Sequence, residues 1–439
     1  MTIEVSDLGG AGGTRRQRAL VLHPDIRGAQ ASRSAASALD EALALALALP
    51  GIEVVGGDVV RLAKPQPGLL FGTGKVAEIK TRIDEDEVDL VLVDGPVSPV
   101  QQRNLEKAWG VKLLDRTGLI LEIFADRART REGVLQVELA ALSYQRTRLV
   151  RAWTHLERQR GGLGFVGGPG ETQIEADRRA IDTQVVRLKR QLEKVVRTRE
   201  LHREARRRVP YPVVALVGYT NAGKSTLFNR LTGAEVLAKD MLFATLDPTM
   251  RAVTLPGGMP VILSDTVGFI SELPTQLVAA FRATLEEVLE ADLILHVRDV
   301  AHPDTEAQAR DVDSILTALG VGQQVARLEV WNKIDLLPAE DPRVTIAART
   351  DGVIAVSAVT GFGLTELIAE VGRLIGDERR IDTVEIGHEQ GRARAFAYAE
   401  GIVMAEVPIE GGIALTLSWS PRQRARFEGL LQGGPAAEA

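Results

Sequence analysis

Uninterrupted apolar runs alternate with amphipathic stretches in the first part of the chain. The runs predict strands at 19–24, 52–60, 88–96 and 111–115, and the stretches predict helices at 32–49 and 98–110. Strands that are apolar on both faces are typical of a parallel sheet covered by helices on both sides. We therefore expect a parallel α/β domain over residues 18–125, after a flexible leader at 1–17.

The period of the apolar positions changes after residue 126. A 4-3 spacing runs through two series of positions: Leu135, Leu139, Leu142, Arg146, Leu149, Trp153, Leu156, and then Ile174, Arg178, Ile181, Val185, Leu188, Leu192, Val195. Heptad-patterned helices joined by a glycine-rich loop predict an antiparallel helical hairpin over 126–209, with its tip loop at 161–173. Arms of roughly 28 residues would project about 40 Å.

Prolines 210 and 212 end the hairpin, and strand and helix patterns then alternate again. This alternation predicts a second α/β domain over 210–378. Further apolar runs predict strands at 394–400, 401–408 and 412–419, and an amphipathic helix after Pro421. We expect a small α+β domain over 379–431 and a flexible tail at 432–439.

Composition adds a charge asymmetry to this organisation. The chain is 45% apolar, has no cysteine and carries a net charge of −6, so disulfides and thiolate metal sites are excluded. We see no signal peptide and no run long enough to span a bilayer, and expect a cytoplasmic protein without integral membrane association. Residues 126–208 hold 20 Lys and Arg against 11 Asp and Glu, and the remainder holds 33 against 48. This basic segment suits a polyanionic partner, although a solvated arginine-rich helix would have the same composition.

The segment "VVALVGYTNAGKSTLFNRL" at 213–231 has the pattern of a phosphate-binding loop between a strand and a helix. Gly218, Gly223, Lys224 and Ser225 follow the spacing that such a loop requires. Glycines let backbone N–H groups surround the phosphates, the lysine reaches the outer phosphates, and the serine hydroxyl can ligate Mg²⁺. The segment therefore predicts a binding site for a nucleoside triphosphate.

Two later segments can complete the phosphate end of this site. Asp265 follows the apolar run at 261–264 and can approach the magnesium, and Gly268 can offer its N–H to the terminal phosphate. A switch loop between these motifs should supply a threonine to magnesium and to the terminal phosphate. Thr245 and Thr249 both qualify by position; we prefer Thr245, because Thr249 follows Pro248 and suits a turn.

Two further strand ends can recognise the base. Asn332, Lys333 and Asp335 suit guanine, because a carboxylate can accept hydrogen bonds from both its ring N–H and its exocyclic amine. Adenine presents no such pair of donors. Ser357 and Ala358 end another strand near the base. In this order along the chain, the motifs predict a GTP-binding α/β domain.

A second glycine-rich segment, "GLLFGTGKVAEI" at 68–79, has only part of this pattern. It lacks the four-residue gap between glycines, and Val76 has no hydroxyl where a magnesium ligand would be needed. We expect a structural turn leading into a helix, and weak nucleotide binding is the alternative.

The segments "GYTNAGKS", "FATLDPT", "DTVGF", "NKID", "SPVQQRNLE" and "GGPGETQIEADRR" together resemble the HflX family of bacterial GTPases. The resemblance runs from about residue 18 to the C-terminus. It implies a GTPase that binds the large ribosomal subunit and its rRNA, and that rescues stalled ribosomes by separating their subunits, notably under heat stress. The hairpin tip would reach toward the peptidyl-transferase region. In one departure, Gly167 stands before Gly168-Pro169-Gly170, where the family commonly has arginine.

The resemblance also implies which residues contact GTP and Mg²⁺. Ser225 and Thr245 would ligate Mg²⁺ directly, and Asp265 through water. The residues implied in nucleotide binding are Gly218, Tyr219, Thr220, Asn221, Ala222, Gly223, Lys224, Ser225, Phe243, Ala244, Thr245, Leu246, Asp247, Asp265, Thr266, Val267, Gly268, Asn332, Lys333, Ile334, Asp335, Ser357, Ala358 and Val359.

Phe269 stands where a GTPase could use a polar side chain to orient water. Phenylalanine can neither orient water nor supply positive charge to the transition state. We interpret it as a core residue, and we expect slow hydrolysis until the ribosome completes the site. No residue can be named as the catalytic base; Lys224 would stabilise charge on the phosphates. Asn221 is a candidate ligand for K⁺, with loop shaping as the alternative.

Two functions of other classes remain open from the sequence. One is a nucleotide-gated scaffold that regulates a protein partner such as a protease, against which the basic hairpin counts. The other is an RNA-remodelling ATPase that uses the N-terminal domain. We expect a monomer that does not bind DNA.

Overall fold

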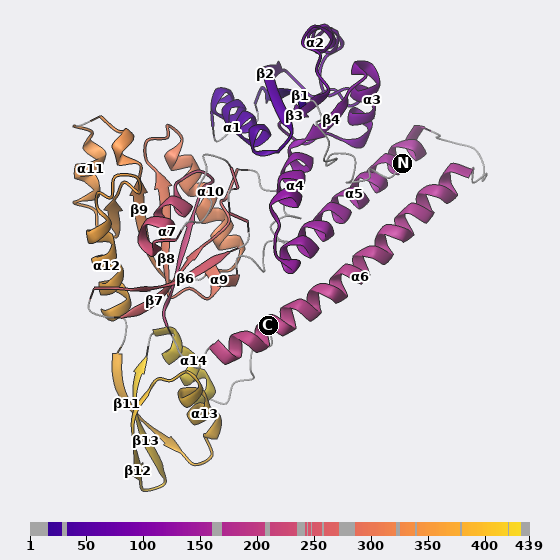
Figure 1. Ribbon diagram of the computed structural model, residues 1–439. Helices are drawn as coiled ribbons and strands as arrows, with labels where there is room; N and C mark the ends of the chain where they lie inside the picture. The colour runs from indigo at the N-terminus through magenta and orange to yellow at the C-terminus, as the bar shows by residue number, and fades with distance from the viewer. Residues whose placement is uncertain are drawn as a thin grey trace. The chain divides into compact units, whose positions relative to one another are not determined.

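The computed structural model describes residues 16–28, 33–159, 169–206, 211–234, 242–243, 245–246, 248–256, 259–271, 286–321, 325–338, 340–377, 380–419 and 421–431. By their contacts these residues form two units (Figure 1). The first runs from the N-terminal side to Lys189 and also contains Leu242 and Phe243; the second contains the others. Residues 1–15 of the expected leader, the tail and most of the hairpin tip lie outside the described residues, and Gln17 belongs to β1 rather than to the leader. Among the helices that are described, none has the length and apolar character to cross a membrane.

The N-terminal sheet is parallel throughout, in the order β2-β1-β3-β4. Its strands are β1 (Gln17–Ile26), β2 (Ile52–Leu62), β3 (Leu90–Val93) and β4 (Lys112–Asp115). Its helices are α1 (Ala35–Ala48), α2 (Thr73–Glu85), α3 (Pro99–Trp109) and α4 (Arg116–Arg127). This arrangement confirms the predicted parallel α/β fold. Helix α4 was not predicted, because its apolar residues follow β4 without a break and only the Asp115 cap marks its start.

Helices cover this sheet because their apolar residues recur at helical spacing. One core joins strand residues such as Leu20 and Val91 to α2 and to Trp109 of α3, whose indole N–H donates to the carbonyl of Val76. The segment at 68–79 forms a turn followed by the start of α2, where Lys75 pairs with Glu78 at 2.6 Å. The expected turn and helix are therefore present.

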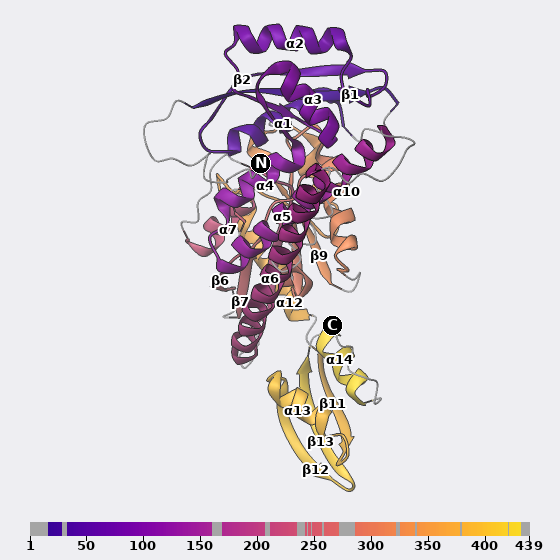
Figure 2. The ribbon, with the colours of Figure 1, turned by 90° about the vertical axis from the view of Figure 1, so that its right-hand side faces the viewer.

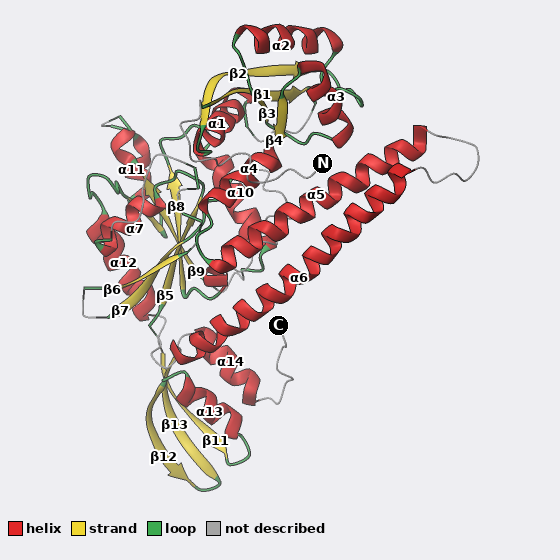
Figure 3. Ribbon diagram, turned by 45° about the vertical axis from the view of Figure 1, so that its right-hand side comes forward, coloured by secondary structure: helices red, strands yellow, loops and turns green. Residues whose placement is uncertain are grey.

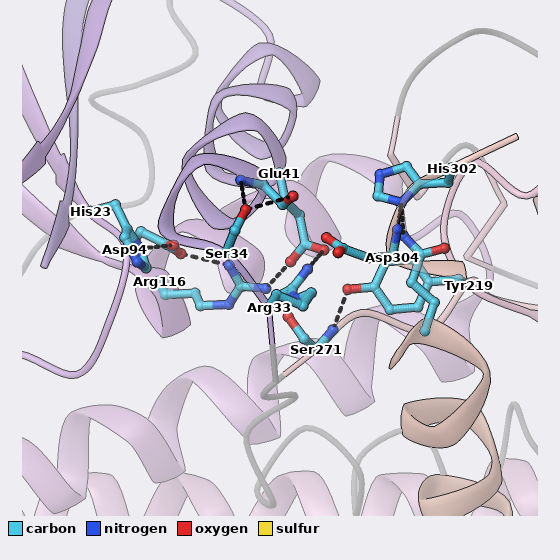
Figure 4. Close-up of polar contacts among 12 residues, drawn as sticks. His23, Arg33, Ser34, Glu41, Asp94, Arg116, Tyr219, Ser271, His302 and Asp304 are labelled. Carbon is cyan, nitrogen blue, oxygen red and sulfur yellow. Dashed lines mark hydrogen bonds and ion pairs between the residues drawn. The ribbon is translucent and has the colours of Figure 1, made fainter. Parts of the chain in front are cut away.

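An ion network lies at the carboxyl ends of β1 and β3 (Figure 4). Arg116 pairs with both Glu41 and Asp94, Arg33 pairs with Glu41, and His23 bonds to Asp94 at 2.8 Å. Burial alone would raise the pKa of Asp94, but the bond from His23 and the charge of Arg116 outweigh it, and the pKa is lowered. Each charge in this network is held by an opposite one.

The hairpin arms are α5 (Arg131–Gln159) and α6 (Pro169–Arg206) (Figure 1). The second arm begins at Pro169, inside the predicted loop 161–173, because proline suits the first turn of a helix. The heptad positions 181, 185, 188, 192 and 195 of α6 are half-buried, whereas the residues between them are mostly exposed. Arg146 of α5 pairs with Asp182 of α6 at 2.8 Å. The predicted hairpin is confirmed.

The second domain is built on a mixed sheet of order β10-β9-β8-β5-β7-β6, in which only β6 is antiparallel to its neighbour. Its strands are β5 (Val213–Gly218), β6 (Thr249–Thr254), β7 (Pro260–Asp265), β8 (Leu293–Asp299), β9 (Ala326–Asn332) and β10 (Val353–Ala355). Its helices are α7 (Lys224–Thr232), α9 (Glu286–Leu289), α10 (Thr305–Ala318), the 3-10 helix η2 (Ile334–Leu336), α11 (Pro342–Ala347) and α12 (Leu364–Asp377). The parallel register of β5, β8 and β9 brings Gly218, Asp299 and Asn332, at the C-terminal ends of these strands, to one edge of the sheet.

The C-terminal domain is an antiparallel sheet of order β11-β13-β12 with two helices on one face (Figures 2 and 3). Its elements are β11 (Arg380–Gly387), α13 (Gly391–Ala399), β12 (Val403–Ile409), β13 (Gly412–Trp419) and α14 (Pro421–Leu431). The predicted strand at 394–400 is wrong: it lies in α13, with Ala393 and Ala397 buried one turn apart. The third strand of this sheet is β11, at the edge beside β13, and the sequence pattern did not predict it.

Candidate GTP site

The phosphate-binding loop joins β5 to α7 in a backbone conformation that needs small residues. A Cβ at Gly218 would lie 2.2 Å from the carbonyl oxygen of Val297. Gly223 has φ +91°, and a Cβ there would lie 2.2 Å from the Asn332 amide nitrogen. Asn221 is also left-handed, with φ +58°. A side chain at Gly218 or Gly223 would push the loop off the strands beside it.

Lys224 is buried at the start of α7. Its Nζ donates to the carbonyl oxygens of Gly218 at 3.1 Å and Tyr219 at 2.8 Å. Burial lowers the pKa of Lys224 to about 8, against the opposing attraction of Asp265. A buried ammonium that bonds only to carbonyls lacks a full counter-charge, which a phosphate at this loop would supply.

Two hydroxyls and a carboxylate meet beside this lysine. Ser225 Oγ donates to Asp265 Oδ2 at 2.7 Å, Thr245 Oγ1 donates to the same oxygen at 2.9 Å, and the hydroxyls are 2.9 Å apart. Thr249 instead begins β6 and pairs with Asp265 through the backbone register. The structure thus brings Thr245 to the cluster by its side chain, and Thr249 only by its backbone.

The residues of this cluster fit a magnesium ion. Asp265 is fully buried, and its Oδ1 has no hydrogen-bond partner. Burial raises the pKa of Asp265, although Ser225, Lys224 and Thr245 act to lower it. An unpartnered oxygen among hard oxygen donors is what Mg²⁺ accepts, directly or through water. The described residues hold no group of three or more His, Cys, Asp or Glu side chains that would build a different metal site.

The segment after Asp265 is bound tightly to the phosphate-binding loop. A Cβ at Gly268 would lie 2.8 Å from Thr220 Cγ2 and 3.0 Å from Lys224 Nζ. Thr220 N donates to the carbonyl of Phe269 at 2.7 Å, and Phe269 N donates to that of Gly218 at 3.1 Å. The Phe269 side chain is 1% exposed. It is a core residue, as the sequence analysis interpreted it.

Tyr219 also connects the phosphate-binding loop to the segment after Asp265. Tyr219 Oη accepts a hydrogen bond from the Ser271 backbone N–H at 2.7 Å, which Figure 4 shows. The neighbouring Thr266 hydroxyl donates to the carbonyl of Leu216 in β5 at 2.7 Å. These bonds hold the chain after Asp265 against β5 and the phosphate-binding loop.

On the base side of the site, the side chain of Asn332 connects the end of β9 to the phosphate-binding loop and to the loop at Ala358. Asn332 donates from Nδ2 to the carbonyl of Ala222 at 2.9 Å and accepts from Ala358 N at 3.0 Å. Lys333 is left-handed, with φ +65°, and pairs with Asp299 at 2.8 Å. The sequence motifs do not include Asp299. Its position directly after the mostly apolar run at 293–297 would have indicated it, because this run forms the buried strand β8.

The base-side residues differ in exposure. Asp335 in η2 is exposed, and Ile334 beside it is half-buried. Ser357 is buried and accepts from Thr360 N at 3.0 Å, whereas Val359 is 70% exposed. The carboxylate of Asp335 is therefore accessible to a ligand.

The switch segment is only partly described. Ala244 and Asp247 lie outside the described residues. Phe243 and Leu246 are both buried. The Phe243 ring packs against Phe124 of α4, with centroids 4.6 Å apart and the rings at 76°. The Phe243 side chain therefore packs on α4, a contact that the sequence did not predict.

Comparisons with known proteins identify relatives of this chain. Family models described as "GTP-binding GTPase N-terminal", "GTP-binding GTPase Middle Region" and "50S ribosome-binding GTPase" match residues 36–125, 127–206 and 213–333. GTPase HflX of Magnetococcus marinus is 52% identical over 87% of this chain and 88% of its own length. GTPase HflX of Escherichia coli K12 is 44% identical over 82% and 83%. A GTP-binding protein from Sulfolobus solfataricus, solved with GDP, aligns over 82% of this chain and 99% of its own with 22% identity and a TM-score of 0.45.

Proposed function

Because this chain belongs to the HflX family of GTPases, we propose that it binds the large ribosomal subunit through its hairpin and separates the subunits of stalled ribosomes. Its GTP hydrolysis is slow alone and stimulated by the ribosome. The observation that carries the proposal is a basic, exposed helical hairpin in the same chain as a GTP site. We further propose that it acts in the cytoplasm as a monomer.

The hairpin supplies the charge that an rRNA surface requires. Over 175–197, where the structure describes the side chains of α6, the exposed basic residues are Arg178, Arg179, Arg187, Lys189, Arg190, Lys194 and Arg197. Arg179 pairs with Glu175 at 3.4 Å, and Arg178 with Asp182 at 3.9 Å. Contacts from such side chains to phosphates release counterions, so binding should weaken steeply with salt. A partner protein would not demand this excess of positive charge.

At the GTP site, named residues of this chain would make the contacts to the phosphates, the metal ion and the base. Lys224 leaves its two carbonyls for the outer phosphates, and Asp335 accepts hydrogen bonds from guanine. Ser225 and Thr245 would hold Mg²⁺ directly, and Asp265 through water. Mg²⁺ held by these residues would supply positive charge beside the phosphates.

The low intrinsic rate follows from Phe269. Its ring is buried and apolar, so it cannot orient a water molecule or stabilise transition-state charge. Docking on the ribosome would order the switch segments and complete the site. Asn221 is a candidate K⁺ ligand that could supply part of the missing charge, but its left-handed conformation also supports a loop-shaping role.

The proposal is tested by GTP hydrolysis of the purified chain in potassium buffer, without and with purified large ribosomal subunits. We expect stimulation of about 100-fold or more, since completing such a site can be worth that much or greater. A fast rate alone, or a rate that large subunits leave unchanged, would contradict it and favour the scaffold function. Replacing K⁺ by Na⁺ in the same assay tests Asn221, because an unchanged rate excludes the ion.

Subunit separation needs its own measurement. Intact ribosomes incubated with the chain and a non-hydrolysable GTP analogue should sediment as separate subunits, and with GDP they should stay joined. If the ribosomes stay joined with the GTP analogue although the chain binds the large subunit, the splitting role is contradicted.

A further inference from the structure

Two carboxylates lie within reach of the Lys333 ammonium on the base side of the GTP site. Asp299 ends β8, and its Oδ2 pairs with Lys333 Nζ at 2.8 Å. Asp335 follows Lys333 by two residues, so the two Cα atoms are at most about 7 Å apart, and the lysine has a flexible four-carbon stem. Asp335 is exposed, and among the described residues no ion pair joins it to Lys333. Lys333 therefore has two candidate partners, and in the structure it pairs with Asp299.

Asp299 is held in place from several sides. Its other oxygen, Oδ1, accepts a hydrogen bond from Ala301 N at 3.1 Å. The adjoining Val300 N donates to the carbonyl of Asn332 at 3.2 Å, and Arg343 donates to the carbonyl of Val300. The Asp299 side chain is only 14% exposed. A partly buried carboxylate that is already positioned holds an ammonium more firmly than an exposed one, whose ion pair costs side-chain entropy and is screened by salt.

Lys333 and Asp335 belong to one turn with a well-defined backbone. Lys333 has φ +65° and precedes η2, whose Leu336 N donates back to the Lys333 carbonyl at 3.0 Å. Between them, Ile334 N donates to the carbonyl of Val356 at 3.4 Å. Because these bonds fix the backbone, rotation of the Lys333 side chain decides which carboxylate receives the ammonium.

From these contacts we infer that Asp299 is a positioning residue for guanine recognition. By holding the Lys333 ammonium, it leaves the Asp335 carboxylate free to accept the hydrogen bonds of the base. Without the charge of Asp299, the ammonium turns to Asp335 and competes with guanine for the same oxygens. The inference rests on the proposed contact between Asp335 and guanine.

The direction of the effect separates this inference from simple electrostatics. Asp299→Asn removes a negative charge beside the binding site of an anionic ligand, and on charge alone nucleotide binding would become stronger. The inference predicts weaker binding. Asparagine keeps an oxygen that can accept from Ala301 N, so the substitution removes the charge without removing that hydrogen bond.

The test compares Asp299→Asn with the wild type in the full chain, with Asp313→Asn as a matched control. Asp313 of α10 pairs with Arg327 of β9 at 3.4 Å, so the control removes one carboxylate from another ion pair of the same domain. Affinities for fluorescent GDP and for a fluorescent non-hydrolysable GTP analogue are measured with Mg²⁺ and without ribosomes, at low and high salt. Circular dichroism checks that each variant is folded.

We expect Asp299→Asn to weaken both nucleotides alike, because they share the base. The loss should be about twofold to sixfold, since an exposed ion pair to Asp335 would hold most of the sites in a form that guanine cannot bind. It should shrink at high salt, which screens such a pair. Asp313→Asn should leave both affinities unchanged. In an Asp335→Asn background, Asp299→Asn should cause no further loss, because no carboxylate is left for the ammonium to capture.

The outcomes separate this inference from the proposed function. If Asp335→Asn alone leaves the affinity for guanine nucleotides unchanged, the proposed role of Asp335 fails. If Asp335→Asn weakens binding but folded Asp299→Asn does not, the inference alone is overturned. A loss that persists in the Asp335→Asn background, or that high salt leaves unchanged, would also overturn it. Should Asp299→Asn not fold, Asp299→Ser decides the question, because its hydroxyl can also accept from Ala301 N.

Discussion

The chain contains two α/β sheets whose carboxyl edges both collect charged residues, but the charges are satisfied differently. At the N-terminal edge, Asp94 and Arg116 are buried within a network of opposite charges. At the GTP edge, Asp265 is buried with one oxygen unpartnered, and Lys224 bonds only to carbonyls. Ligand sites tend to leave polar groups short of partners, whereas structural networks satisfy them.

The pKa values report the same difference. Burial acts to raise the pKa of both aspartates, but only at Asp94 do its neighbours outweigh burial and lower it. The cations behave in parallel: the pKa of Arg116 is raised, because its two carboxylate partners outweigh burial, and that of Lys224 is lowered. At the GTP edge, the charged forms of Lys224 and Asp265 are therefore destabilised by burial. A magnesium–triphosphate complex can stabilise both charges.

The largest effect should come from breaking the N-terminal network. Arg116→Met would leave two buried carboxylates without their shared partner and should lower the free energy of unfolding by about 3 kcal/mol or more. Hydrogen exchange of peptides from β1 and β3 in increasing urea measures this change. Arg373→Met removes an exposed pair with Glu370 and should cost less than about 1 kcal/mol. Equal effects of the two variants would show that the buried network is not structural.

Base recognition provides the next test, because it asks whether the N-terminal edge binds nucleotide at all. Asp335→Asn should weaken GTP binding about 100-fold, the loss expected for hydrogen bonds to a charged acceptor. Binding isotherms with GTP and ATP measure it. ATP turnover that survives this variant undiminished would establish a second nucleotide site and remove the contrast between the two edges.

The magnesium cluster should respond in opposite directions with and without ligand. Asp265→Asn removes a buried charge, so the ligand-free chain should be as stable as wild type or more so in thermal unfolding. GTP turnover should fall about 10- to 100-fold, as for other groups that hold a metal through water. Loss of stability without nucleotide would mean that Asp265 serves the fold as Asp94 does.

The smallest expected effect is a pH dependence of binding. In the ligand-free chain the pKa of Lys224 is about 8, below its ordinary value of 10.5. Above pH 8, Lys224 in the ligand-free site is therefore mostly deprotonated. The negative phosphates of GTP favour the protonated form, so Lys224 must take up a proton when GTP binds. Affinity for GTP should fall by up to about tenfold per pH unit above 8. Calorimetry in two buffers of different ionisation enthalpy measures the proton uptake, and no uptake would mean that Lys224 stays charged.

Much of the fold was predictable because it depends on local periodicity. The buried runs around Val91 and Leu216 predict parallel strands wherever they occur, and the heptads predict the hairpin. The misassigned segment at 394–400 shows the limit of that reasoning. Its alternation of Ala with larger residues fits a strand, but α13 buries Ala393 and Ala397 against a sheet that β11 already completes.

The sequence by itself determined the order and spacing of the nucleotide motifs, because a phosphate-binding loop and its flanking strand and helix are local. Only the tertiary structure decided that the Thr245 hydroxyl meets Asp265, that Phe243 packs on Phe124, and that the two buried aspartates have opposite pKa shifts. Those properties depend on which residues from distant segments become neighbours. Distance in space, unlike spacing along the chain, is set by the packing of whole helices and sheets.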